Sequence, residues 1–255
     1  MSGSLDSEWC KLFRARGGKI AFYNCGQPYA ALIERSVFDR HGFFGDAERC
    51  DEVWLLSKDG QFGAMMRGMY RCPVHEAPYL WSPAFLEETS KKAEKEELRF
   101  GYRPGSLMSS PSAPAIFEPN ISPIKMGIIP FMICEEVERG DPSAIGHVHL
   151  LNVKHMTSQH SFVFLVENSD LYKRNNLTPG ERDHFSHVMA RGANVVVSHQ
   201  IDCAQNYLYL DAVAGATRSC TIRISSRTSA IIIPTRTSRP EPRSCCWRAA
   251  SMIAI

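Results

Sequence analysis

The stretch EVWLLSKDGQFGAMMRGMY, residues 52–70, carries the strongest local signal for the fold. Residues 52–57 and 61–70 both have the composition of strands, and Lys58-Asp59-Gly60 stands between them. Asp-Gly supplies the positive φ that a tight reversal between antiparallel strands requires. The pattern therefore predicts a β-hairpin, and it favours a sheet that is mainly antiparallel.

Further elements are predicted on both sides of this hairpin. KIAFYN, residues 19–24, alternates well enough to predict the first strand, and Ser82-Pro83 is typical of the start of a helix over residues 84–98. Strand composition recurs in the second half, over residues 124–134, 144–154, 161–166, 195–199 and 207–213. One helix interrupts these strands, because Thr178-Pro179-Gly180-Glu181 has the spacing of a capping box and Gly192 suits the helix end.

These elements predict an α+β fold: a mainly antiparallel β-sheet body with two or three helices and a disordered, basic C-terminal tail. Four regions are expected along the chain. Residues 1–102 form an N-terminal α/β region, and residues 103–123, with five prolines, form a Pro/Ser-rich linker or long loop. Residues 124–213 form a β-rich region with one helix, and residues 214–255 form the tail.

The tail differs sharply from the body in composition. From Ala214 onwards it has seven arginines, no lysine, one acidic residue and twelve serines and threonines, for a net charge of +6. The rest of the chain has a net charge of −4. So polar a segment buries too little apolar surface to offset the entropy of ordering, and we expect it to be disordered alone. An unselected reading frame is the alternative explanation for so abrupt a change.

The arginines lead to the first functional hypothesis, a non-enzymatic nucleic-acid-binding protein. Arginine pairs with phosphate and stacks on bases, so spaced arginines could follow an RNA or DNA backbone. The candidate residues lie in the tail and in the RFGYR segment: Arg218, Arg223, Arg227, Arg236, Arg239, Arg243, Arg99 and Arg103. By analogy with viral genome-packaging proteins of the coat or nucleoprotein type, the body would mediate assembly, and a homo-oligomer is a possible form.

Two other hypotheses stay open. His147 and His149 alternate on a predicted strand, so their side chains share a face and could bind one metal ion in a metal-dependent enzyme. A third ligand is not specified by the sequence, and two solvent-facing histidines explain the same pattern. The last alternative is a protein-interaction module without catalytic activity.

Several classes of protein lack their usual sequence support. The chain has no P-loop, dinucleotide-binding, nucleophile-elbow or zinc-protease motif, and we therefore predict no cofactor. No apolar run approaches the length of a membrane helix, so no membrane partner is expected. Nine cysteines include no C-x-x-C, the odd count cannot pair completely, and no signal peptide precedes them. These features predict an intracellular protein, cytoplasmic or nuclear, with reduced thiols.

Overall fold

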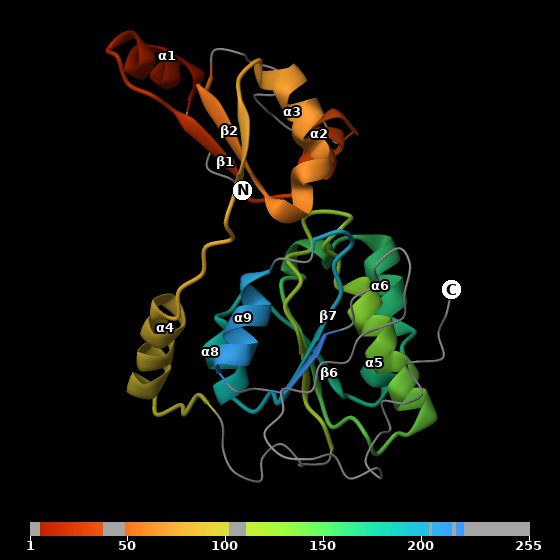
Figure 1. Cartoon of the computed structure of the whole chain (residues 1–255). Coiled ribbons are helices and arrows are strands. Elements are labelled where there is room, and N and C mark those ends of the chain that lie inside the picture. Colours follow the sequence, from red (N-terminus) through yellow and green to blue (C-terminus); the bar gives the residue numbers. More distant parts are fainter. Residues whose placement is uncertain (1–5, 38–48, 102–110, 204–205, 216–217, 222–255) are drawn as a thin grey trace. The chain divides into compact units, whose positions relative to one another are not determined.

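The computed structural model describes residues 6–37, 49–101, 111–203, 206–215 and 218–221 (Figure 1). The chain divides into two compact units. Unit 1 comprises Met1–Leu80 and Asp202–Gln205, and unit 2 comprises Trp81–Ile201 and Asn206–Ile255. Each unit contains a parallel β-sheet with helices between its strands. Within the described residues, no helix is long and apolar enough to cross a membrane.

Unit 1 is built on three parallel strands in the order β1-β2-β3. The strands are β1 (Ala21–Asn24), β2 (Glu52–Leu56) and β3 (Val74–Ala77). The helices are α1 (Ser7–Ala15), α2 (Pro28–Val37), the 3₁₀ helix η1 (Ser57–Phe62) and α3 (Gly63–Tyr70). Alternate side chains of β2, Val53 and Leu55, pack with Met66 and Tyr70 of α3 in the core of this unit.

Unit 2 is built on five parallel strands in the order β6-β5-β4-β7-β8. The strands are β4 (Pro114–Ile116), β5 (Val148–Leu150), β6 (Leu177–Pro179), β7 (Val195–Ser198) and β8 (Arg218–Thr221). The helices are α4 (Ala84–Lys95), α5 (Ile128–Gly140), η3 (Lys154–Met156), α6 (His160–Glu167), α7 (Asp170–Lys173), α8 (Phe185–Ala190) and α9 (Tyr207–Ala214).

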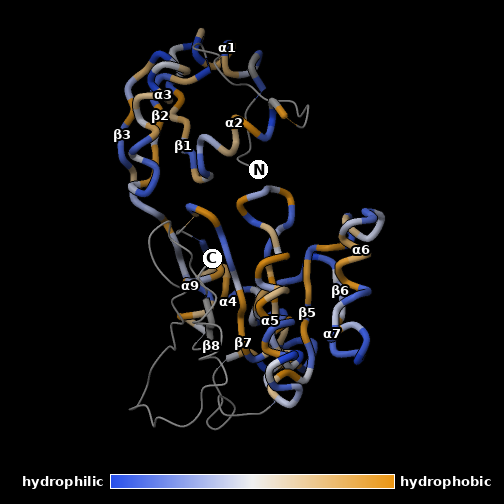
Figure 2. Tube along the Cα trace, turned by 90° about the vertical axis from the view of Figure 1, so that its right-hand side faces the viewer, coloured by the Kyte–Doolittle hydropathy of each residue, from blue (hydrophilic) through white to orange (hydrophobic). Residues whose placement is uncertain are grey.

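Both faces of the unit 2 sheet are buried. Ile116, Val195 and Val197 face one apolar cluster that includes residues of α5, α6 and α7, and the intervening Ala115 and Val196 face a second cluster with α4, α8 and α9. In Figure 1 α5 and α6 lie on one side of β7, and α8 and α9 lie on the other. Strands covered on both faces are near-continuously apolar, as the hydrophobic colour of β7 in Figure 2 shows.

The prediction of a mainly antiparallel α+β fold is wrong, because every strand pair in both sheets is parallel. The predicted hairpin over residues 52–70 is instead β2 followed by η1 and α3, and β2 pairs with β1 and β3. Three predicted strands, over residues 124–134, 161–166 and 207–213, lie largely in α5, α6 and α9. The helix count of two or three is therefore also wrong.

Other predicted elements are confirmed. Residues 19–24 contain β1, residues 195–199 contain β7, and the helix predicted over 84–98 is α4. The helix predicted after Thr178 begins later than expected, since Thr178 lies in β6 and α8 follows His184, but Gly192 has the predicted positive φ of 123°. Most of the tail predicted to be disordered, residues 222–255, lies outside the described residues.

Candidate functional site

The order of the strands in unit 2 creates one distinctive position at the carboxyl edge of its sheet. The chain passes from β4 through β5 to β6 on one side, returns to β7 beside β4, and continues to β8 on the other side. The segments after β4 and β7 therefore leave in opposite directions, so the carboxyl ends of these two strands form the switch point of the sheet. Ligands of doubly wound α/β proteins bind at such a switch point.

A buried carboxylate occupies this position. Glu118 follows β4 and its exposed fraction is 1%. Its Oε1 accepts hydrogen bonds from the Ser198 hydroxyl and, at 2.9 Å, from the backbone N–H of His199. Its Oε2 accepts from Gln200 Nε2 at 3.1 Å. One side chain after β4 thereby holds three consecutive residues at the end of β7.

The environment of Glu118 acts on its protonation in two directions. Burial raises the pKa of the Glu118 carboxyl, because the charged form loses hydration. The hydrogen bonds from Ser198, Gln200 and His199, and the nearby charge of Lys125, lower this pKa but do not cancel the effect of burial. Ser198 Oγ also lies 3.1 Å from the hydroxyl oxygen of Tyr209 in α9, so the hydrogen-bonded network extends to the helix that follows β7.

A second network fixes the segments after β4 and β5. Asn120 is buried, and its Nδ2 donates to the carbonyl oxygens of Glu118 at 2.9 Å and of Leu151 and Asn152 at 3.3 Å each. Its Oδ1 accepts from Gly127 N at 2.6 Å, at the start of α5. Asn152 Nδ2 donates in return to the carbonyl of Phe117 at 2.9 Å.

The two asparagines also share an uncommon backbone conformation. Asn120 has φ 53° and Asn152 has φ 58°, in the left-handed region that asparagine tolerates better than most residues. Backbone conformations of this kind are retained where the surrounding structure enforces them, often at functional sites. The shape of the carboxyl edge is thus set by side-chain amides rather than by glycines.

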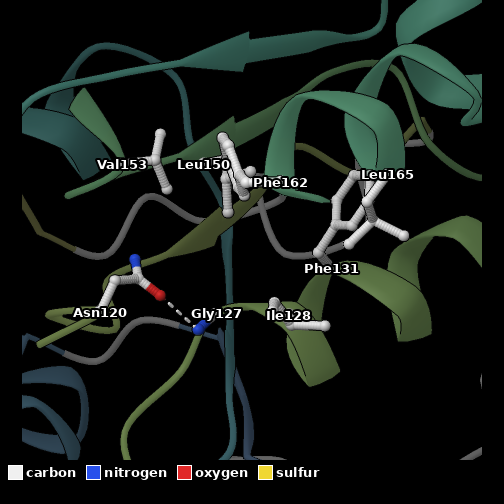
Figure 3. A pocket seen from close by; sticks show the side chains of 8 residues that line it. All are labelled: Asn120, Gly127, Ile128, Phe131, Leu150, Val153, Phe162 and Leu165. Atoms are coloured by element: carbon white, nitrogen blue, oxygen red, sulfur yellow. Dashed lines mark hydrogen bonds between the residues drawn. The ribbon is translucent and has the colours of Figure 1, made fainter. Parts of the chain in front are cut away.

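An apolar hollow lies beside the second network (Figure 3). It contains about 210 Å³ of empty space, open solvent included, and leaves no room for a water molecule. Its lining comes from the loop after β4, from β5 and its following loop, and from α5 and α6: Asn120, Gly127, Ile128, Phe131, Leu150, Val153, Phe162 and Leu165. Figure 3 shows the Asn120–Gly127 hydrogen bond at its edge. The hollow is therefore a narrow gap in the apolar packing beneath the carboxyl edge of the sheet.

Polar side chains surround the two networks on the same edge. His155 Nε2 lies 2.9 Å from the carbonyl oxygen of Asn120, and Lys154 forms an ion pair with Glu181. His199 is buried, and burial lowers the pKa of its imidazole, so the ring is neutral at physiological pH. Lys125 is only partly buried. The edge therefore offers amide, imidazole and ammonium groups, from Asn152, His155 and Lys125, near a buried carboxyl.

The structure places the predicted metal ligands elsewhere. His147 lies just before the start of β5, at the amino edge of the sheet, and His149 lies within β5. Their rings are 5.1 Å apart, and His147 Nε2 is 2.7 Å from Thr178 Oγ1. Burial, with His147 nearby, lowers the pKa of His149. Across the ranges that the structure describes, no group of three or more histidine, cysteine, aspartate or glutamate residues could hold a metal ion.

The predicted nucleic-acid-binding arginines are mostly beyond the part of the chain that can be described. Arg103, Arg223, Arg227, Arg236, Arg239 and Arg243 lie outside the described residues. Arg218 begins β8, in register with Val195 of β7, and Arg99 is an exposed residue that follows α4.

Sequence reasoning missed the residues that form the candidate site: Glu118, Asn120, Ser198, His199 and Gln200. The available signal was positional. In PAIFEPN, residues 114–120, and VVVSHQ, residues 195–200, polar residues directly follow short apolar runs. Had these runs been assigned to neighbouring parallel strands, the polar residues would have been expected at one edge.

Three comparisons with known proteins bear on this chain. A family model described as "Protein of unknown function (DUF2827)" matches residues 1–216, and so ends close to the change of composition at Ala214. No curated protein sequence is significantly similar. Among solved structures, a trehalose-6-phosphate synthase, OtsA, is similar with a TM-score of 0.49 and 10% identity, over 84% of this chain and 55% of that one. The chain thus spans little more than half of that protein.

These findings correct the first functional hypothesis. The nucleic-acid-binding structural protein of coat or nucleoprotein type rested on a β-rich assembly body with a basic arm, whereas the body consists of two α/β units with parallel sheets. The description of the matching family gives no support for nucleic-acid binding. The hypothesis is therefore wrong, together with its viral and RNA-binding descriptions.

Proposed function

We propose that unit 2 of this chain, which belongs to the DUF2827 family, binds a small polar molecule of the nucleotide type. The proposed site lies at the carboxyl ends of β4 and β7. The sheet order supports this position, because it makes β4 and β7 the neighbours from which the chain leaves in opposite directions.

The single observation that carries the proposal is the buried Glu118 at this point. Removing a carboxyl group from water is costly unless hydrogen bonds compensate for the lost hydration. Here the hydrogen bonds to the carboxyl group come from residues 198–200 at the end of β7. Glu118 therefore fixes the segment after β4 to the segment after β7. Glu118 is thus a positioning residue, which holds the side chains of Ser198 and Gln200 and the backbone N–H of His199 at the base of the site.

The chemistry around Glu118 supports a nucleotide. Hydroxyl groups of a ribose pair well with amide and imidazole groups, which Asn152 and His155 provide at this edge. A phosphate group needs a cation, and Lys125 is close enough to Glu118 to lower its pKa while remaining partly exposed. Lysine acts as a point charge toward phosphate. We assign Lys125 to the phosphate and the asparagine network to the shape of the ribose site.

The test is a binding measurement on the full chain with three probes, ADP, GDP and UDP. At a concentration of about 100 times the dissociation constant, a ligand stabilises the folded protein by about 2.7 kcal/mol. For a domain of about 150–250 residues, that corresponds to a rise in melting temperature of roughly 5–10 °C. We expect at least one probe to produce such a shift.

Two lysine variants show whether the binding occurs at this site. Lys125→Gln should lower the affinity for the probe by about tenfold or more, which corresponds to a loss of about 1.4 kcal/mol of binding free energy. Lys91→Gln, which changes an exposed lysine of α4 in the same way, should leave the affinity unchanged. The proposal is wrong if none of the three probes binds at millimolar concentration, or if Lys125→Gln binds as tightly as the parent.

A reducing, intracellular location, cytoplasmic or nuclear, is also proposed. Supporting it, six cysteines are in the thiol form and outside any disulfide: Cys10, Cys25, Cys50, Cys72, Cys134 and Cys203. Free thiols persist in compartments where glutathione and thioredoxin keep them reduced. Alkylation of the denatured, unreduced protein should modify more than half of the nine cysteines. Modification of one or none would contradict this location.

A further inference from the structure

Two cysteines of unit 1 lie close together in space although 22 positions separate them in sequence. Cys50 precedes β2 and Cys72 precedes β3, at the amino ends of two neighbouring parallel strands. Their Sγ atoms are 3.9 Å apart. Cys50 is 1% exposed, and Cys72 is only partly buried. One thiol of the pair can thus be reached from solvent while the other is held behind it.

The backbone around the pair is compatible with a covalent link. The backbone N–H of Val53 donates to the carbonyl of Pro73 at 2.9 Å, which fixes the two strand starts side by side. Neighbouring strands lie about 4.8 Å apart, within the range of about 4.4–6.8 Å between the Cα atoms of natural disulfides. The Sγ atoms, 3.9 Å apart, must come to a bond length of about 2.05 Å, and rotation of the two side chains is the movement that brings them together.

We propose that Cys50 and Cys72 form a reversible intramolecular disulfide, so that the pair is a site of oxidative modification in unit 1. The oxidant is a small-molecule disulfide of the glutathione class. The Cys72 thiolate attacks one sulfur of the oxidant, forms a mixed disulfide and releases one thiol. The Cys50 thiolate then attacks Cys72 Sγ, which closes the intramolecular bond and releases the second thiol. Two protein thiols are oxidised, and one small disulfide is reduced to two thiols.

The surroundings of the pair make this exchange slow at neutral pH. Burial raises the pKa of the Cys50 thiol to about 12, and burial also raises the pKa of Cys72. The thiolate is the attacking species, so its scarcity keeps the pair reduced until pH or oxidant concentration rises. Charged and titratable groups that act on the pair come from α1, from the segment before β2, from β2 and from α3: Arg14, Arg49, Asp51, Glu52 and Tyr70.

The consequence of the bond is local to unit 1. It would tie the start of β2 to the start of β3 and enclose β2, η1 and α3 in a covalent loop. Such a loop restricts the unfolded chain, so the oxidised form should melt several degrees higher than the reduced form. This inference does not depend on the proposed nucleotide site, which lies in unit 2.

The sequence makes the bond easy to detect. Arg49 precedes Cys50 and Arg71 precedes Cys72, so trypsin releases one peptide of residues 50–58 and another of residues 72–91, each with a single cysteine. The full chain is incubated with glutathione disulfide at pH 7 and at pH 9, alkylated, digested and analysed by mass spectrometry. We expect a linked pair of these peptides, two hydrogens lighter than their sum, that forms faster at pH 9 and disappears with dithiothreitol.

Cysteine variants separate this bond from nonspecific oxidation. Cys25→Ser removes an exposed thiol of the same unit and should leave the linked peptides unchanged. Cys50→Ser should stop the reaction at a glutathione adduct on Cys72. The proposal is overturned if native protein at pH 9 yields both peptides alkylated and unlinked, or if either cysteine links preferentially to Cys25. These outcomes are read on the parent protein, so they hold even if Cys50→Ser fails to fold.

Discussion

Replacement of Glu118 by alanine tests the network at the switch point. In the folded protein, the carboxyl group is the acceptor for Ser198 Oγ, His199 N and Gln200 Nε2. Ser198 retains the Tyr209 hydroxyl as a partner after the change. His199 N and Gln200 Nε2 lose the hydrogen-bond acceptor that the structure shows for them, in a position where both residues are buried.

The magnitude follows from these two donors. A buried polar group without a partner costs about 1–3 kcal/mol, so two of them cost about 2–6 kcal/mol. Removing Glu118 also removes the cost of burying its own carboxyl group, the cost that raises its pKa. We therefore expect the Glu118→Ala variant to lose about 2–3 kcal/mol of the free energy of unfolding, at the lower end of that range.

Glu118→Gln provides a finer test of the same geometry. The amide oxygen can keep the hydrogen bonds from Ser198 and His199, but the new NH₂ group faces Gln200 Nε2, so two donors meet. Gln200 Oε1 is buried and has no hydrogen-bond partner in the described structure, so rotation of the Gln200 amide would present this oxygen as the acceptor. The expected cost is about 1 kcal/mol or less.

The assay must report on unit 2 by itself, because two units need not unfold in one transition. Native-state hydrogen exchange of amides in residues 114–118 and 195–200 gives the free energy of opening at β4 and β7. Glu136→Ala and Glu136→Gln change an exposed glutamate of α5 and serve as controls, with effects within about 0.5 kcal/mol. A Glu118→Ala effect below this limit, or equal effects of the two Glu118 variants, would refute the reasoning.

Three further outcomes are expected. Burial raises the pKa of folded Glu118 above its ordinary value of 4.5, so its contribution to stability is present below pH 4.5 and lost as the pH rises through the folded-state pKa. The opening free energy of unit 2, from hydrogen exchange, should therefore fall in the parent relative to Glu118→Gln between pH 4.5 and pH 8, and a relative rise would contradict this. Glu135→Gln weakens the bonds from Asp170 N at 2.7 Å and Leu171 N at 3.2 Å, and hydrogen exchange in unit 2 should show a loss of about 1–2 kcal/mol, with no loss arguing against that contact. Replacing His147 and His149 together by glutamine should cost less than about 1 kcal/mol in the same assay, and a loss above about 2 kcal/mol would show a structural role that the hypothesis of solvent-facing histidines does not allow.

The sequence predicted single elements better than their arrangement. β1, β7 and α4 were foreseen because alternation, valine content and a Ser-Pro start are local signals. The hairpin prediction is wrong because Asp-Gly is also compatible with a helical turn: Asp59 is a buried residue of η1, and residues 63–70 form α3. Strand direction depends on which distant strands pair, and no local signal in residues 52–70 encodes that.

Helix α5 shows why a strand was predicted in its place. Residues 124–134 are rich in isoleucine, which favours strands by composition. The buried positions nevertheless recur with a helical period: Pro130, Phe131, Cys134, Glu135, Val137 and Glu138. Two of these six are glutamates, held by Arg139, Arg174 and the backbone of α7, so they weaken the apolar periodicity of the buried face.

The candidate site was out of reach for a related reason. Glu118 and residues 198–200 are 80 positions apart, and nothing in either segment forms a known motif. They meet only because β4 and β7 are neighbours in a parallel sheet. An antiparallel sheet would place the residues after neighbouring strands at opposite edges, so it does not predict that these polar residues meet.

The most direct test of the nucleotide site is hydrogen–deuterium exchange of the full chain with and without 5 mM ADP, GDP or UDP. The account predicts slower exchange for at least one probe in residues 117–127 and 198–201, which follow β4 and β7, and unchanged exchange in residues 142–147 at the amino edge of the same sheet. No change with any of the three probes, or protection confined to residues 142–147, would contradict it.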